Sequence, residues 1–237
     1  MKNTLRLHVL LVFLLILSAC ATVKNQMNDS DFMAQNQPVR ELKILVASDG
    51  SHTRDQIDQF LQECSEIFRE QVGITFIPLK YIWIQWENRD VIPMLEELAR
   101  STEGYEFDLA IGFTRWTTGE LLTRNLVGAW EGCIDDTYRR YIVVKHLDKR
   151  TLLHEVGHAF IFSHAHSNSG LMMPVSFQIV PFIPIKFESI YLSSEDRIEV
   201  LKNKGRQFAQ IPMIASREHV LAKTTRSRPS PLWPEIR

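Results

Sequence analysis

Hydrophobic and polar positions follow two different periods after residue 40, and these periods predict a chain that alternates between strands and helices. Short apolar runs bounded by turn residues predict strands, and apolar residues at three- and four-residue spacing predict helices. Gly73 is expected to end the first helix. The predicted strands cover 42–46, 74–78 with 81–86, 107–113, 126–130 and 141–144, and the predicted helices cover 53–72 and 91–100.

The order of these elements predicts the fold class. Helices lie between the early strands, which favours parallel pairing, whereas the last two strands are joined by a polar turn around 133–136, which favours a hairpin. The expected fold is therefore α+β, with an α/β-like mixed twisted sheet and one further helix around residue 155.

The first twenty residues have the features of an export signal. Lys2 and Arg6 precede an apolar run over 9–17, which is too short to cross a hydrocarbon core of about 30 Å. Residues 17–20, Leu-Ser-Ala-Cys, resemble the bacterial lipobox. That resemblance implies lipidation of Cys20 and a membrane contact through the lipid anchor. Because Ala21 stands where aspartate is the inner-membrane retention cue, the expected location is the cell envelope, on the outer membrane facing the periplasm or the surface.

The expected domain organisation follows from composition along the chain. Residues 1–19 form the signal peptide, and the polar stretch to residue 40 forms a flexible tether after the lipidated Cys20. Residues 41–205 are expected to form the folded domain. The tail over 206–237 has five basic residues and three prolines after position 216. It is expected to be a solvated, flexible extension, with contact to anionic lipid as the alternative.

Overall composition restricts the class of protein further. The chain has 237 residues with 45% hydrophobic and 23% charged side chains, which is typical of a globular domain. Lys and Arg number 27 against 28 Asp and Glu, so the chain has no basic excess that would indicate binding to nucleic acid. The protein is expected to be a monomer. Cys64 lies on an apolar helix face and is expected to be buried. A disulfide between Cys64 and Cys133 is the alternative.

Residues 154–158 carry the motif H-E-x-x-H. On a helix, His154 and His158 share one face and can direct their imidazoles at one metal ion. Leu152, Val156 and further apolar residues cover the other faces, so the helix is expected to be buried. Asp148 is its expected N-cap.

Further residues extend this motif into the pattern of a known group of enzymes. His164 lies ten residues after His154, and Met172 lies eight residues after His164, within Gly-Leu-Met-Met-Pro at 170–174. These features resemble the metzincin clan of zinc endopeptidases, with H-E-x-x-H-x-x-G-x-x-H and a Met-turn, and are most similar to the matrixins. Residues 192–196 and Gly205 resemble the bounds of the matrixin C-terminal helix, with Ser193 and Asp196 as a capping pair.

The resemblance implies a zincin-like catalytic domain and a function. His154, His158 and His164 would bind Zn²⁺, and Glu155 would act as general base toward the metal-activated water. Met172 would pack beneath the ligands. A polypeptide substrate would pair with an edge strand at 127–130, through Gly128 and Ala129, and 173–177 would form the wall of an apolar specificity pocket through Val175 and Phe177.

One position departs from the family pattern and leaves the third ligand open. Ile161 replaces the family glycine, so either the turn after the helix is built differently, around Ser163, or His164 does not reach the metal. His166 is the rival third histidine. A carboxylate from Glu195 or Glu199 is a further alternative, and so is a purely structural role for the histidines.

The function also has alternatives at this stage. A non-catalytic envelope lipoprotein of the same fold that binds zinc or peptide is one, although intact Glu155 argues for catalysis. A peptidase acting on peptidoglycan peptides is the other. No family-type cysteine switch precedes the domain, and Asp29 or Asp31 is the alternative latency group.

Overall fold

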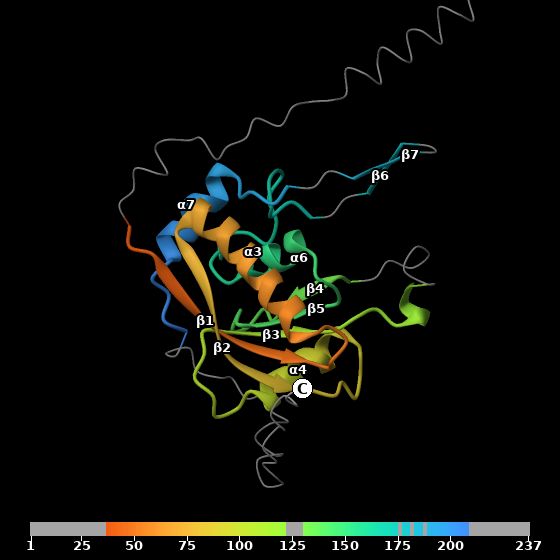
Figure 1. Cartoon of the computed structure of the whole chain (residues 1–237). Helices are drawn as coiled ribbons and strands as arrows, with labels where there is room; N and C mark the ends of the chain where they lie inside the picture. Colours follow the sequence, from red (N-terminus) through yellow and green to blue (C-terminus); the bar gives the residue numbers. More distant parts are fainter. Residues whose placement is uncertain (1–36, 122–129, 175–176, 181–182, 187–188, 209–237) are drawn as a thin grey trace, which may run out of the picture.

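A five-stranded mixed sheet forms the centre of the protein. A computed structural model describes residues 37–121, 130–174, 177–180, 183–186 and 189–208, and Figure 1 shows the path of the chain. The strands are β1 (Arg40–Ser48), β2 (Ile74–Trp83), β3 (Leu109–Phe113), β4 (Gly132–Ile134) and β5 (Tyr141–Val144), in the order β2-β1-β3-β5-β4. The first four in this order pair in parallel, and β4 pairs antiparallel to β5 at one edge.

Residues at both ends of the main helices account for their bounds. Helix α3 (Arg54–Val72) begins with a capping box between Thr53 and Gln56 and ends at Gly73, whose φ of 63° closes the last turn. Helix α4 covers Val91–Ser101 and α6 covers Lys149–His158. Helix α7 (Ser194–Asn203) has Ser193 as its N-cap, and the Ser193 hydroxyl accepts a hydrogen bond from the Asp196 N–H.

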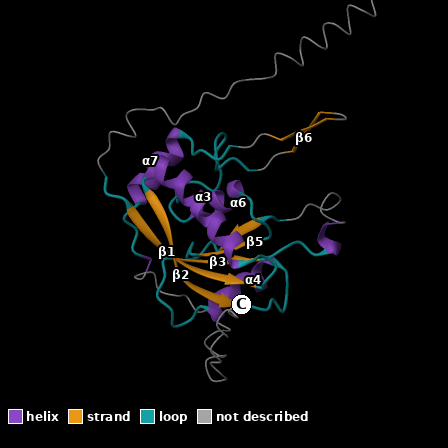
Figure 2. Cartoon of the chain, viewed as in Figure 1, coloured by secondary structure: helices purple, strands orange, loops and turns teal. Residues whose placement is uncertain are grey.

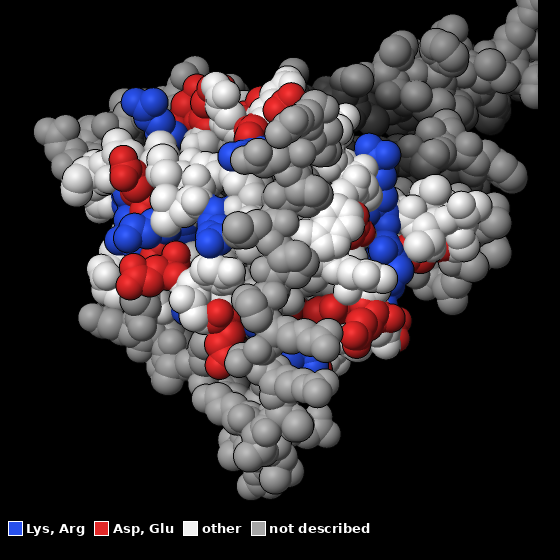
Figure 3. Space-filling view, turned by 60° about the horizontal axis from the view of Figure 1, so that its bottom comes forward, with Lys and Arg blue, Asp and Glu red and all other residues white. Residues whose placement is uncertain are grey.

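The sheet is covered on both faces. Alternate residues of β1 belong to different cores: Leu42, Ile44 and Val46 pack with α3, α6 and α7, whereas Leu45 and Ala47 pack with α4. Figures 1 and 2 show α3 and α6 on one side of the sheet and α4 on the other. Since the strand period is two, a strand buried on both faces reads as a continuous apolar run, as β1 does. On the surface shown in Figure 3, acidic and basic side chains lie interspersed.

The mixed sheet, both predicted helices and the caps at Asp148 and Ser193 are confirmed. The two segments predicted within 74–86 form one strand, β2. The reading of 133–136 as turn alone was wrong, because β4 begins at Gly132 and pairs with β5. A hairpin of β6 (Phe177–Val180) and β7 (Ile183–Lys186) was not predicted.

Several predictions fall on other parts of the chain. The signal peptide, Cys20, the tether up to residue 36 and the tail from 209 onward lie outside the described residues. Within the described part, no helix is both long and apolar enough to cross a membrane. Cys64 is buried, as expected, and both Cys64 and Cys133 are free thiols, so the structure does not contain the alternative disulfide.

Candidate metal centre

Helix α6 presents the first two histidines of the site. Its N-terminus is fixed by the Asp148 carboxylate, which accepts the Thr151 N–H at 2.7 Å. Most of its side chains are buried because it lies between the sheet and the segments that follow it. One helical turn separates His154 from His158, and their ring centroids lie 4.8 Å apart.

A third histidine joins them from the loop after the helix. One nitrogen from each of His154, His158 and His166 lies within 4.8 Å of the others. The His166 ring stacks on His154, with centroids 5.4 Å apart and planes at 25°, and its centroid lies 5.5 Å from that of His158. Among the described residues, this is the group of histidine, cysteine or acidic side chains whose geometry can hold a metal ion.

The geometry of the first two rings fits zinc. His154 Nδ1 lies 2.8 Å from the Leu171 carbonyl and donates its proton there, which leaves Nε2 as a lone-pair donor. The two Nε2 atoms of His154 and His158 lie 3.1 Å apart. On a tetrahedral zinc ion with Zn–N bonds of about 2.0–2.1 Å, neighbouring nitrogens lie about 3.3 Å apart.

The electrostatics of the pair agree with that geometry. Burial lowers the pKa of His154 to about 4 and, together with the neighbouring His154 ring, lowers the pKa of His158 to about 3. Both imidazoles are therefore neutral at physiological pH, which is the form that binds a metal.

His164, the predicted third ligand, is not part of this group. Its Nε2 lies 2.8 Å from Asp196 Oδ1 and 3.0 Å from Ser167 Oγ, and its Nδ1 lies 2.7 Å from Ser163 Oγ. Both ring nitrogens are thus engaged away from His154 and His158. The structure brings His166, the rival, to the place where the family pattern puts His164. Neither Glu195 nor Glu199 belongs to the group.

The turn after α6 carries His164 and His166 to these positions. The family pattern has glycine at the position of Ile161, but here Ile161 is fully buried in the core and does not have a positive φ. Side chains take over the exposed carbonyls of the helix end: Arg139 donates to those of His158 and Ile161, Arg206 to that of Ala159, and Asn203 to that of Phe160. These contacts hold the chain where it leaves the helix, and Ser163 belongs to this turn, which was one of the two expectations.

Glu199 of α7 binds the backbone of the turn that follows α6. Its carboxylate accepts the backbone N–H groups of Phe162 at 2.6 Å and Ser163 at 2.9 Å. Glu199, which the sequence analysis considered as an alternative metal ligand, therefore supports the loop that carries His166.

Met172 lies against Gly157 of the helix that carries His154 and His158. It is fully buried, and a Cβ placed on Gly157 would lie 2.5 Å from its sulfur. Gly157 stands between the two histidines in sequence, so the absence of a side chain there lets Met172 approach the helix. The turn that contains Met172 begins at Gly170, which has a φ of 75°. The Leu171 N–H in this turn donates to the Tyr191 carbonyl at 2.7 Å.

Glu155 lies on the side of α6 that contacts β4. It is 8% exposed, and burial raises its pKa to about 8 despite a hydrogen bond from the Ile134 backbone N–H. A carboxylate that is held near neutral pKa beside a metal site is suited to taking and releasing a proton.

Among the strands that the structure describes, β4 is the sheet edge nearest to Glu155. The backbone of residues 131, 133 and 135 pairs with β5, so the N–H and C=O groups of Gly132 and Ile134 point away from β5. The predicted edge at 127–130 is not this strand, and Gly128 and Ala129 lie outside the described residues. The sequence analysis missed the short strand that begins at Gly132.

The predicted wall of the specificity pocket is described only in part. Val175 lies outside the described residues, and Phe177 begins β6. Met173 is described, and its carbonyl accepts a hydrogen bond from Arg150 of α6.

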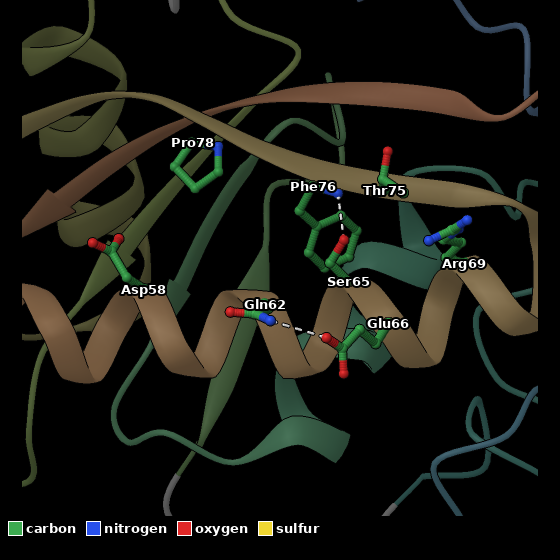
Figure 4. A pocket seen from close by; sticks show the side chains of 8 residues that line it. All are labelled: Asp58, Gln62, Ser65, Glu66, Arg69, Thr75, Phe76 and Pro78. Carbon is green, nitrogen blue, oxygen red and sulfur yellow. Dashed lines mark hydrogen bonds between the residues drawn. The ribbon is translucent and has the colours of Figure 1, made fainter.

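A separate pocket of about 240 Å³ lies between α3 and β2, and Figure 4 shows its lining. Polar groups in it pair with one another: Gln62 Nε2 donates to Glu66 at 3.0 Å, and the Phe76 N–H donates to Ser65 at 2.9 Å. None of the residues of the histidine site lines this pocket.

Comparisons with known proteins find similarity only at the level of structure. No protein-family model matches the sequence, and no curated protein matches it. The structure is similar to that of archaemetzincin from Methanopyrus kandleri, at 14% identity and a TM-score of 0.47, covering 70% of this chain and 97% of that one. It is also similar to metalloproteinase-II from Bacteroides fragilis, at 16% identity and a TM-score of 0.41, covering 70% and 54% of the two chains. These are distant similarities in chain path, so the chemistry of this chain follows from its own side chains.

Proposed function

We propose that the protein is a zinc-dependent endopeptidase whose metal is held by His154, His158 and His166. The observation that carries the proposal is the convergence of three imidazoles beside a buried glutamate that belongs to the same H-E-x-x-H helix. When bound, zinc supplies Lewis acidity to the scissile carbonyl and to the attacking water.

The protein's own residues supply the remaining chemistry. Glu155 accepts the proton of the attacking water and passes it to the leaving amine, for which its raised pKa is suited. The Leu171 carbonyl holds His154 in the tautomer that directs Nε2 at the metal. Met172 packs against the helix between the two histidines and limits their movement.

The proposed substrate is a polypeptide in extended conformation. The outward N–H and C=O groups of Gly132 offer main-chain hydrogen bonds to such a segment beside Glu155, whereas the Ile134 N–H already donates to Glu155. A strand laid along this edge passes the metal site with chain on both sides, which favours cleavage within a polypeptide. Peptides of peptidoglycan are a chemically related alternative.

The proposed location is the bacterial cell envelope, with acyl chains on Cys20 as the membrane anchor. The support is the lipobox-like sequence at 17–20 and the polar stretch that separates it from β1. The protein would act as a monomer on substrates near the membrane surface.

The test combines metal content with hydrolysis. Purified full-length protein is expected to contain one zinc per chain and to cleave an unfolded protein substrate. His154→Ala and His166→Ala should lose most of the zinc, whereas Glu155→Gln should keep the zinc and lose hydrolysis. His52→Ala, which removes a buried histidine outside the group, serves as the control and should keep both.

The possible outcomes separate the alternatives. Zinc without hydrolysis in the unmodified protein would favour a zinc-binding lipoprotein, and no zinc at all would contradict the proposal. Cleavage of peptidoglycan peptides but not of proteins would move the substrate to the cell wall.

A further inference from the structure

The loop that carries His166 is tied to α7 on both sides of that histidine. Asp196 Oδ1 lies 2.8 Å from His164 Nε2 and also accepts the Ser167 hydroxyl. His164 and Ser167 flank His166 in sequence, so one carboxylate oxygen holds the chain before and after the proposed third ligand.

Asp196 is itself rigidly placed. It is fully buried in the first turn of α7, and its second carboxylate oxygen accepts the Ser193 hydroxyl at 2.7 Å. A buried carboxylate is stable only with hydrogen-bond partners, and Ser193, Ser167 and His164 provide them. The loop and α7 therefore depend on each other.

His166 needs such support more than the other two histidines. His154 and His158 are positioned by a buried helix, whereas His166 is exposed and lies in a loop. The Ser167 N–H also donates to the Met172 carbonyl at 3.1 Å, which fixes the same loop to the turn beneath the site. A metal ligand on a loop binds tightly only if surrounding groups hold it in place before the metal arrives.

We propose that His164 and Asp196 are positioning residues for the metal centre, and that their hydrogen bond places His166 beside His154 and His158. The inference rests on the proposed function, since it assigns a role toward the zinc of that site. It also gives a use to the histidine that the family pattern makes a ligand: in this chain His164 holds the loop and does not bind the metal.

The experiment measures zinc affinity of the full-length protein by competition with a chromophoric chelator. Visible spectra of the cobalt-substituted protein report the ligand set. Replacing a ligand, as in His166→Gln, should weaken zinc binding on the order of 10³-fold and change the cobalt spectrum. His164→Gln and Asp196→Asn should each weaken binding about 10–100-fold with the cobalt spectrum of three nitrogen ligands retained. The variant with both substitutions should bind zinc as tightly as the single variant with the lower zinc affinity, because the two residues act through one contact.

Matched controls separate positioning from loss of stability. Asp108→Asn removes a buried carboxylate that accepts the Lys43 N–H at 3.0 Å, and His52→Gln removes a buried ring, both outside the metal site. Both variants should lower the thermal unfolding temperature without changing zinc affinity.

Three results would overturn the inference. Unchanged zinc affinity in His164→Gln and Asp196→Asn would remove the positioning role while leaving the proposed function intact. Loss of zinc in His164→Gln with retention in His166→Gln would make His164 the ligand. Absence of zinc binding in the unmodified protein would overturn the proposed function and this inference together.

Discussion

Gly132 and Glu155 are in contact across the junction of the edge strand β4 and helix α6. A Cβ on Gly132 would lie 3.1 Å from Glu155 Cγ and 2.5 Å from Thr151 Cγ2. The strand approaches the helix this closely only because residue 132 has no side chain. The position of Glu155 relative to β4 therefore depends on a residue that has no side chain.

Gly132→Ala is expected to reduce catalytic turnover about 10–100-fold while the protein keeps its zinc. The added methyl group must displace β4 from α6, and small misplacement of a general base relative to the substrate is costly. The measurement is kcat together with zinc content. Gly205→Ala is the matched control, because a Cβ there meets no atom within 4 Å.

Relief of the clash provides the complementary test. Adding Thr151→Ser to Gly132→Ala removes the methyl group that is closest to the new Cβ and should restore part of the turnover. A Gly132→Ala protein with normal turnover would mean that Glu155 is not positioned by this contact.

Glu155→Gln is expected to stabilise the metal-free protein increasingly as the pH rises. Burial raises the pKa of Glu155 from an ordinary value of 4.5 to about 8. Between these values the folded protein holds a proton that the unfolded chain has released, so the carboxyl group lowers stability as the pH rises through this range. Glutamine removes that dependence.

The measurement is the thermal unfolding temperature of both metal-free proteins between pH 4.5 and pH 8.5. The two proteins should have the same unfolding temperature at pH 4.5. At pH 8.5 the unfolding temperature of Glu155→Gln should be higher by about 5 °C or more. The low pKa values of His154 and His158 affect both proteins equally and cancel in the difference. A difference that does not change with pH would contradict the raised pKa.

Arg206→Ala is expected to lower the free energy of unfolding by about 2–4 kcal/mol. The Arg206 guanidinium donates to the carbonyls of Ala159, Tyr138 and Arg139, and its removal leaves partly buried acceptors without this donor. Arg206→Lys should restore little, because an ammonium group cannot reach several carbonyls in one plane.

Denaturant unfolding of the metal-free protein measures this effect. The control is Arg100→Ala on the exposed surface of α4, which should change the free energy by no more than about 0.5 kcal/mol. An equal effect of the two alanine variants would show that the carbonyls at the end of α6 do not depend on Arg206.

Removal of the metal is expected to abolish hydrolysis and to lower the unfolding temperature. A ligand that binds only the folded state stabilises it by about 4 kcal/mol at a free concentration a thousand times its dissociation constant. Treatment with a zinc chelator, followed by dialysis and return of one equivalent of zinc, should remove and then restore both properties. His166→Gln provides the comparison, since its unfolding temperature should respond little to either step.

The sequence by itself determined the elements and the first half of the site. Short apolar runs predicted β1 and β5, which are largely buried on both faces, and helical spacing predicted α3 and α4, which each have one apolar face. The positions of His154, His158 and Glu155 on one buried helix could be predicted as well, because helix geometry fixes the two histidines, four residues apart, on one face. Periodicity and helix geometry were sufficient to predict the features that depend on contacts between residues close in sequence.

Only the tertiary structure decided which histidine completes the group and which strand forms the edge beside Glu155. The family spacing selected His164, but that ring contacts Asp196, which is 32 residues away in sequence, and this contact leaves His166 beside the helix. Similarly, β4 was hidden in an apparent turn because a three-residue strand has too few positions to show a period. Side chains from α7 and from the segment before β5 set the path of the loop after α6, and such long-range contacts leave no periodic signal in the residues they position.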